Sequence, residues 1–155
     1  MRVWVLGSGT LLPDAERGSP SHALQADDSF ILLDCGAGTL KSLARLGLPW
    51  KHLSHLCISH FHTDHVGDLA SILFALKHGL GGAREEPLTL LGPRGLGNHL
   101  NALARAHGPF IQDPGFPLMI RELAPGESWE EEGSGFRIDT YATHHTDGSL
   151  ALRIS

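Results

Sequence analysis

The chain has 155 residues, of which 41% are hydrophobic and 19% charged, the ordinary composition of one folded domain with its own core. Its formal net charge of −5 excludes binding to nucleic acid or to an anionic membrane that is driven by overall charge. Two cysteines make no disulfide framework, and no apolar run nears the ~20 residues of a membrane-spanning helix, so we expect a single cytoplasmic domain without membrane association.

The first part of the chain predicts short strands. Val3–Leu6 is an apolar run followed by a glycine-rich turn, which is typical of a buried strand. A dinucleotide-binding turn would need a further glycine at position 12, where Leu12 stands, so we expect no such cofactor. Residues 21–25 and 29–33 predict two strands joined as a hairpin.

A short helix and another strand come next. Thr39 can cap a helix that ends near Gly47. Residues 54–59 form an apolar run that predicts a strand. His52 and His55 flank the start of this strand, and we expect both to be solvated or to lie at a sheet edge.

Two longer helices are predicted in the middle of the chain. Apolar residues recur at helical spacing over 66–77, and again over 96–106. Between these helices, residues 81–87 are expected to form a surface loop. His99 and His107 are isolated on the second helix, so we interpret them as surface or packing residues.

The remaining apolar runs predict strands and complete the pattern. These runs lie at 88–91, 118–123, 136–142 and 149–154. Strands therefore dominate both ends of the chain, and helices lie between them. This order fits a sheet that is covered by helices on one outer face.

The stretch His60-Phe61-His62-Thr63-Asp64-His65 concentrates potential metal ligands. It contains three imidazoles and a carboxylate, the nitrogen and oxygen donors that zinc and similar ions favour. His60 and His62 alternate, so both point to the same side of an extended segment and can bind one ion. Asp64 and His65 follow where a helix begins, so they approach from another direction and could bind a second ion. A solvated histidine-rich loop is the alternative, since the chain has 11 histidines.

A second group of histidines follows the strand predicted at 136–142. His144 and His145 lie in a loop at the end of this strand, about 80 positions after His65. A catalytic zinc site typically has three protein ligands and an open position for water. One of these two histidines could therefore complete a site with His60 and His62.

Taken together, these features resemble the metallo-β-lactamase superfamily. The segment His60–His65 matches its HxHxDH motif in full. Further matches are the opening Val5–Thr10, the strand-end acid and glycine in Leu33–Gly36, and Leu91–Pro93 before the second long helix. The tail His145–Ile154 is similar to the third motif of the ribonuclease Z-like branch, so the resemblance covers nearly the whole chain.

The resemblance implies an α+β fold, the four-layer αββα sandwich, of which residues 1–155 would supply the N-terminal half to two-thirds. It also implies a hydrolase in which a metal-bound hydroxide attacks phosphorus or a carbonyl carbon. Zinc is the expected metal, as one or two ions, with manganese or iron as alternatives. The expected substrate is a small-molecule, nucleotide or RNA phosphodiester, while an ester, lactone or thioester would suit the same chemistry.

The resemblance further implies a first ion held by His60, His62 and one histidine of the later loop. Alignment with the family's third motif favours His145 as this ligand and makes His144 its neighbour. These three imidazoles would leave one position free for water or substrate.

The second ion, by the same resemblance, would be held by Asp64 and His65. Asp64 would also orient the nucleophile or accept its proton, and so is the expected catalytic residue. Asp34 would orient the site through hydrogen bonds, although an ordinary turn aspartate is an equal alternative.

One departure from the family pattern concerns the second ion. In the family, a bridging aspartate and a last histidine lie beyond the third motif, whereas this chain ends at Ser155. The second ion would then have two protein ligands instead of four, and half a sandwich would leave an apolar sheet face uncovered. Three explanations stay open: a piece of a longer protein, a short form whose homodimer covers the open sheet face, or a degenerate relative that binds one metal or none.

The leading functional hypothesis is a metal-dependent hydrolase, nearest the ribonuclease Z-like phosphodiesterases. The first alternative is a non-catalytic metal-binding or interaction module built from part of the fold. The second is an iron-dependent oxidative enzyme, because some of those share the HxHxDH motif. Whether this chain hydrolyses anything by itself is left open by the missing ligands.

Overall fold

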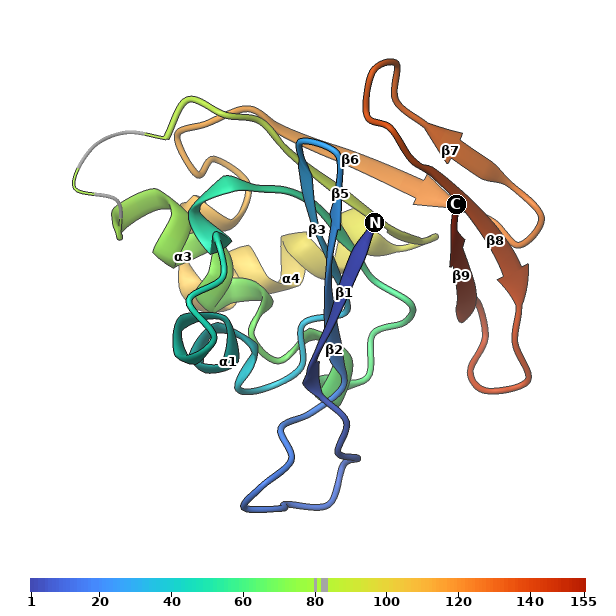
Figure 1. Ribbon diagram of the computed structural model, residues 1–155, viewed down its shortest axis with the longest axis horizontal. Helices are drawn as coiled ribbons and strands as arrows, with labels where there is room; N and C mark the ends of the chain where they lie inside the picture. Colours follow the sequence, from blue (N-terminus) through green and yellow to red (C-terminus); the bar gives the residue numbers. More distant parts are fainter. Residues whose placement is uncertain (80, 82–83) are drawn as a thin grey trace.

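The computed structural model describes residues 1–79, 81 and 84–155 (Figure 1). In these residues, strands form two sheets that face each other. The strands are β1 (Arg2–Gly7), β2 (Ser21–Ala26), β3 (Ser29–Leu33), β4 (Leu53–Cys57), β5 (Leu88–Pro93), β6 (Leu118–Leu123), β7 (Ser128–Glu130), β8 (Arg137–Ala142) and β9 (Leu150–Ile154). The larger sheet has the order β1-β2-β3-β4-β5-β6, and the smaller one has the order β7-β8-β9.

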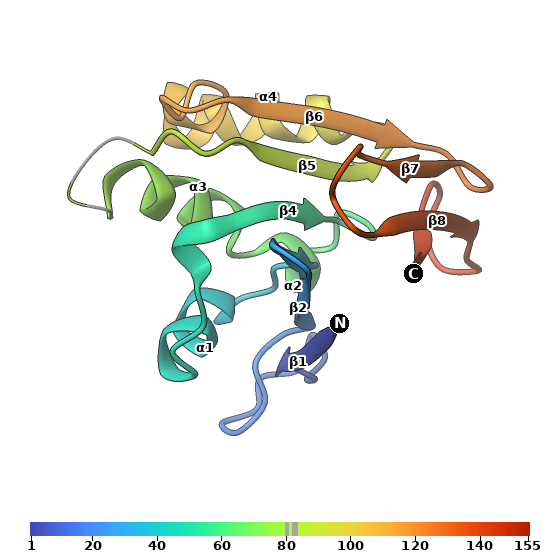
Figure 2. The ribbon, with the colours of Figure 1, turned by 45° about the horizontal axis from the view of Figure 1, so that its top comes forward.

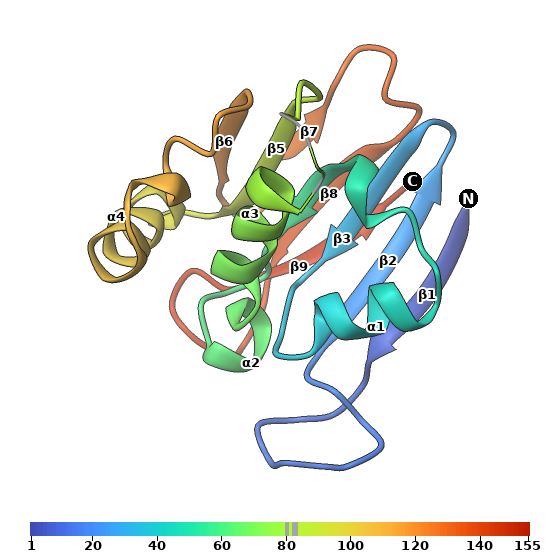
Figure 3. The same cartoon turned by 90° about the vertical axis from the view of Figure 1, so that its left-hand side faces the viewer.

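Helices cover the outer face of the larger sheet, on the side away from the smaller sheet (Figures 1 and 3). They are α1 (Thr39–Arg45), α2 (Thr63–Val66), α3 (Leu69–His78) and α4 (Leu96–His107), with short 3₁₀ turns at Trp50–His52 and Pro109–Ile111. The predicted arrangement of a sheet with helices on one outer face is therefore confirmed. Within the described residues, none of the helices has the length and apolarity needed to cross a bilayer.

The strand pairing in the larger sheet changes from antiparallel to parallel at β3. The first three strands are antiparallel, whereas β3, β4, β5 and β6 run parallel to one another. The arrows of β4, β5 and β6 point the same way in Figure 2. The hairpin predicted between residues 21–25 and 29–33 is confirmed as β2 and β3. Parallel strands need crossover connections, and the helices on the outer face supply them.

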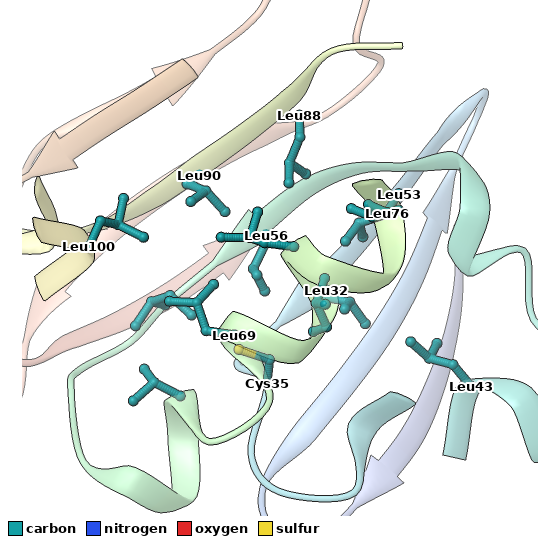
Figure 4. Close-up of a cluster of buried hydrophobic side chains, with 14 of the residues drawn as sticks. Leu32, Cys35, Leu43, Leu53, Leu56, Leu69, Leu76, Leu88, Leu90 and Leu100 are labelled. Carbon is teal, nitrogen blue, oxygen red and sulfur yellow. The ribbon is translucent and has the colours of Figure 1, made fainter. Parts of the chain in front are cut away.

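Two cores lie on the two faces of the larger sheet. Leu32, Leu56 and Leu90 point toward the helices and pack with Leu69 and Leu100 (Figure 4). Residues next to them along the strands point to the other face, because side chains alternate. That second core joins the two sheets and consists of Leu24, Ala26, Ile31, Cys57, Leu91, Leu123, Phe136, Ile138 and Leu150.

The outer face of the smaller sheet is polar. Ile138 on β8 is buried against the larger sheet, while Arg137 and Asp139 point outward and bond to each other at 2.9 Å. The expectation of an uncovered apolar sheet face is therefore wrong for this face. Exposed apolar side chains occur instead on the edge strand β1, where Val3 and Val5 are 61% and 59% exposed.

Local signals misplaced two helix boundaries. Thr39 is the first residue of α1 rather than its cap, and its hydroxyl donates to the carbonyl of Gly36 at 2.7 Å. The helix predicted over 66–77 corresponds to α3, which begins only at Leu69, because Gly67 and Asp68 separate it from the short helix α2 that ends at Val66. The break is stabilised by tertiary bonds, since the Asp68 amide donates to the carbonyl of Cys35 and its carboxylate accepts from the amide of Leu40.

Two polar residues expected at the surface are buried. His55 is 3% exposed because β4 lies between β3 and β5, so its placement at an edge or in solvent was wrong, whereas His52 is exposed as expected. Arg84 in the expected loop 81–87 is 4% exposed, and its guanidinium donates to the carbonyls of Lys51, Leu53, Glu86 and Pro87. Residues 82–83 of that loop lie outside the described residues.

Candidate metal centre

The candidate ligands follow the ends of two neighbouring parallel strands. Leu33 pairs with Cys57, so β3 and β4 end next to each other, at the edge where sites form in sheets of this kind. Asp34 begins the turn after β3, and Ser59 begins the loop after β4. This loop carries His60 and leads into α2.

His145 reaches the same place from the smaller sheet, in the loop between β8 and β9. The amide of Leu150, the first residue of β9, donates a 3.0 Å hydrogen bond to the carbonyl of Ser59. This bond ties the start of β9 to the loop that follows β4. The facing of the two sheets thus brings together histidines that are 85 residues apart in the chain.

Three histidine nitrogens converge at this edge. His145 Nε2 lies 3.2 Å from His60 Nε2 and 3.2 Å from His62 Nδ1, and all three atoms lie within 4.8 Å of one another. Zinc–nitrogen bonds of about 2.0–2.1 Å in a tetrahedron place ligand nitrogens roughly 3.3–3.4 Å apart. The donor set and its spacing therefore fit a zinc-like ion.

The structure places His145 in this cluster and leaves His144 outside it. His60 is 6% exposed, whereas His62 and His145 are exposed. The group thus has one buried donor and two that face solvent, so the cluster is open to solvent. His145 is thus the one of the two histidines that lies near the motif, and its role as the ligand stays a prediction.

Asp64 and His65 lie beside the three-histidine cluster, on α2. The ring centroids of His65 and His60 are 4.0 Å apart, and His65 Nε2 lies 3.7 Å from Asp64 Oδ2. Both side chains are thus positioned to share an ion. In the described part of the chain, however, this pair does not belong to a group of three or more donor atoms at ligand spacing.

Asp34 connects the end of β3 to the motif loop. One carboxylate oxygen accepts from the Ser59 amide at 2.7 Å, and the other accepts from His65 Nδ1 at 2.7 Å and the Ser59 hydroxyl at 2.8 Å. Its φ of +55° lies in the left-handed region, which aspartate tolerates better than most residues. The hydrogen bonds expected of an orienting residue are present, while its effect on metal binding stays a prediction.

The protonation of two histidines suits different roles. Burial lowers the pKa of His60, the charge of His65 acts in the same direction and that of Asp34 opposes it, so the net shift favours the neutral form that binds metal ions. The hydrogen bond to Asp34 raises the pKa of His65. An ion bound at His65 would therefore compete with a proton.

Sequence reasoning missed contributions from Ser59, Gly36 and Phe61. A Cβ on Gly36 would lie 2.0 Å from the carbonyl oxygen of Asp64, so only glycine lets α2 approach the turn after β3. Phe61 stacks on His99 of α4, with ring centroids 4.9 Å apart, which confirms the packing interpretation of His99. The signal available for Ser59 was its position directly before His60, the first histidine of the motif.

A cavity of about 390 Å³ opens beside the cluster. It is lined by Leu11, Ser19, Ala37, His62, Thr63 and Asp64. Leu11 is 78% exposed and comes from the long loop between β1 and β2. Leu11 and Ala37 thus give the cavity an apolar part of its lining, beside the polar side chains of His62 and Asp64.

Comparisons with known proteins agree with this geometry. The profile of the metallo-beta-lactamase superfamily matches residues 15–154. Ribonuclease Z of Mycobacterium sp. (strain KMS) is 30% identical in an alignment 173 residues long, which covers 98% of this chain and 60% of that protein. Ribonuclease Z of Mycobacterium marinum is 28% identical, over 89% of this chain and 53% of that protein. The chain thus spans about half the length of the curated relatives that it matches.

Solved structures share the fold at lower identity. The short form of human tRNase Z superposes with a TM-score of 0.80 at 22% identity, over 99% of this chain and 64% of that one. The metallo-beta-lactamase fold protein YhfI from Bacillus subtilis gives 0.79 at 24% identity, over 99% of this chain and 58% of that one. The two facing sheets and the HxHxDH loop at their edge agree with the family profile. Because that profile matches residues 15–154, the chain belongs to the metallo-beta-lactamase superfamily.

Proposed function

We propose that this chain is the metal-binding part of a metal-dependent hydrolase that cleaves phosphodiesters, similar to the ribonuclease Z relatives. The observation that carries the proposal is the convergence of His60 Nε2, His62 Nδ1 and His145 Nε2, with 3.2 Å between His145 and each of the other two. Zinc is the proposed metal because three imidazole nitrogens at this spacing suit it, with manganese or iron as alternatives.

The proposed roles follow from the geometry. His60, His62 and His145 would hold the ion, and His60 would do so in its neutral form. When bound, such an ion supplies an activated water nucleophile and polarises the scissile bond. Asp64 borders the cavity, so its carboxylate could orient the attacking water and accept its proton. His65 would bind a second ion together with Asp64.

The phosphodiester substrate is proposed from the relatives and not from the lining of the cavity. The residues lining the cavity include no lysine or arginine among the described positions, so the negative charge of a phosphate would be balanced by metal. Ribonuclease Z is the name of the curated relatives, and an RNA or nucleotide substrate is proposed from it. A cytoplasmic location belongs to the proposal as well, and is supported by the two buried free cysteines.

A second candidate is a non-catalytic metal-binding module. It is favoured by one observation: in the described residues, Asp64 and His65 do not join a group of three donors at ligand spacing. Such a module would bind one ion at the three histidines. It would not turn over a phosphodiester.

Hydrolysis of bis(p-nitrophenyl) phosphate by protein loaded with zinc or manganese separates the two candidates. We expect turnover that falls at least about 100-fold in His62→Ala, because a direct ligand should matter no less than its outer partners do. His52→Ala is the matched control, since that exposed histidine pairs with Glu86 away from the cluster. Absence of turnover in fully metallated protein would favour the non-catalytic module, and equal rates in His62→Ala would contradict both.

A further inference from the structure

The Ser59 hydroxyl lies between a carboxylate and two candidate metal ligands. Its Oγ is 2.8 Å from Asp34 Oδ2, 2.9 Å from His60 Nδ1 and 3.4 Å from His65 Nδ1. These distances describe a small network in which each group has a limited number of protons to give. The direction of each hydrogen bond can therefore be worked out.

The Asp34 carboxylate can only accept hydrogen bonds. His65 Nδ1 must donate to it at 2.7 Å, and the single Ser59 hydroxyl proton must also be donated to it at 2.8 Å. Once that proton is used, Ser59 Oγ can only accept. The 2.9 Å contact with His60 is then a bond donated by His60 Nδ1.

We infer that Ser59 is a positioning residue that fixes the tautomer and ring orientation of His60, and so raises the metal affinity of the three-histidine cluster. A proton on Nδ1 leaves the lone pair of neutral His60 on Nε2. That is the atom 3.2 Å from His145 Nε2. Outer partners of this kind typically alter metal affinity 10- to 100-fold, by an order-of-magnitude estimate. The inference rests on the metal-binding role proposed above.

The network lets one carboxylate serve both parts of the candidate centre. Asp34 reaches His65 directly and reaches His60 only through the Ser59 hydroxyl. A hydroxyl is required at position 59 because the group there must donate on one side and accept on the other. Threonine retains this ability, and alanine loses it.

The backbone of Ser59 makes its own bonds, which separates the hydroxyl from a structural role. Its amide donates to Asp34 and its carbonyl accepts from Leu150, and both bonds are available to alanine. Ser54→Ala is a matched control from β4, the strand that precedes Ser59. That serine donates its hydroxyl to the carbonyl of Phe30 and contacts His55, outside the cluster.

Two measurements test the inference. The first is zinc affinity, by competition with a chelator, for the wild type, Ser59→Ala, Ser59→Thr and Ser54→Ala. We expect Ser59→Ala to bind zinc about 10- to 100-fold more weakly, Ser59→Thr to restore affinity, and Ser54→Ala to match the wild type. Equal affinity in Ser59→Ala, or no restoration by threonine, would overturn the inference.

The second measurement is the tautomer of His60 in the metal-free protein, from long-range nitrogen–proton NMR correlations of its ring. The wild type should hold the Nδ1–H form, and Ser59→Ala should show a mixture of both forms. An unchanged tautomer in Ser59→Ala would overturn the inference. Neither measurement depends on turnover. A protein that binds zinc without hydrolysing phosphodiesters would contradict the proposed function, and the two measurements would still test the role of Ser59.

Discussion

Asp34 shows what a sequence pattern can and cannot reveal about single residues. The alternation of His60 and His62 predicts that both point to one side, because that relation is local. The bonds from Asp34 to Ser59 and His65 span 25 and 31 residues and depend on β3 lying next to β4. Local pattern does not determine which strands are neighbours, so it left Asp34 between an orienting and an ordinary turn residue.

Leu11 offers a test of the cavity beside the cluster. Leu11→Ser should raise the KM for bis(p-nitrophenyl) phosphate about fivefold, if roughly 1 kcal/mol of apolar contact is lost, and leave kcat unchanged. Leu12→Ser is the control, because Leu12 is also largely exposed, at 70% against 78% for Leu11, but does not line the cavity. Steady-state kinetics of both variants check this. The same rise in KM for both, or in neither, would remove Leu11 from the substrate contact.

Strand β4 shows why the sequence predicted where strands lie in the chain better than it predicted which of their residues are buried. Its existence follows from the apolar run, but its position between two parallel partners does not. His55 is therefore buried, with Nδ1 2.8 Å from Ser54 Oγ, Nε2 3.1 Å from Glu131 Oε2, and the rings of Trp129 and Phe136 against its own. It joins the larger sheet to the segment that connects β7 and β8.

The burial of His55 predicts how the stability of the fold depends on pH. Burial lowers its pKa, and Glu131 only partly opposes this shift. The unfolded chain therefore binds this proton more readily than the folded one. Stability is complete above the ordinary histidine pKa and falls as the pH drops below it.

Chemical denaturation between about pH 5 and 7 measures this dependence, a window set by the ordinary histidine pKa. In His55→Gln the free energy of unfolding should vary less with pH, since glutamine does not titrate. His52→Gln should retain the wild-type slope, because His52 is exposed. An unchanged slope in His55→Gln would show that another group governs the acid sensitivity.

The helix-covered larger sheet could be predicted from the sequence pattern, whereas the facing smaller sheet was expected only from the family resemblance. Strands at both ends with helices between them indicated a covered sheet, and the motif indicated its family. Strand β7 was missed because three residues, Ser128–Glu130, carry almost no periodic signal. The polar outer face of the smaller sheet was readable, since Arg137, Asp139 and Tyr141 alternate with the inward-facing Ile138 and Thr140. A homodimer that covers an open sheet face stays a prediction.

The joining of the two sheets is what creates the candidate centre, because His145 alone comes from the smaller one. Zinc binding by the wild type, His145→Ala and His144→Ala, measured as affinity and as metal content per chain, therefore tests the account most directly. We predict that the wild type and His144→Ala bind zinc equally, and that His145→Ala binds at least about 100-fold more weakly. Equal binding by His145→Ala, or a folded wild type that takes up no zinc, would contradict it.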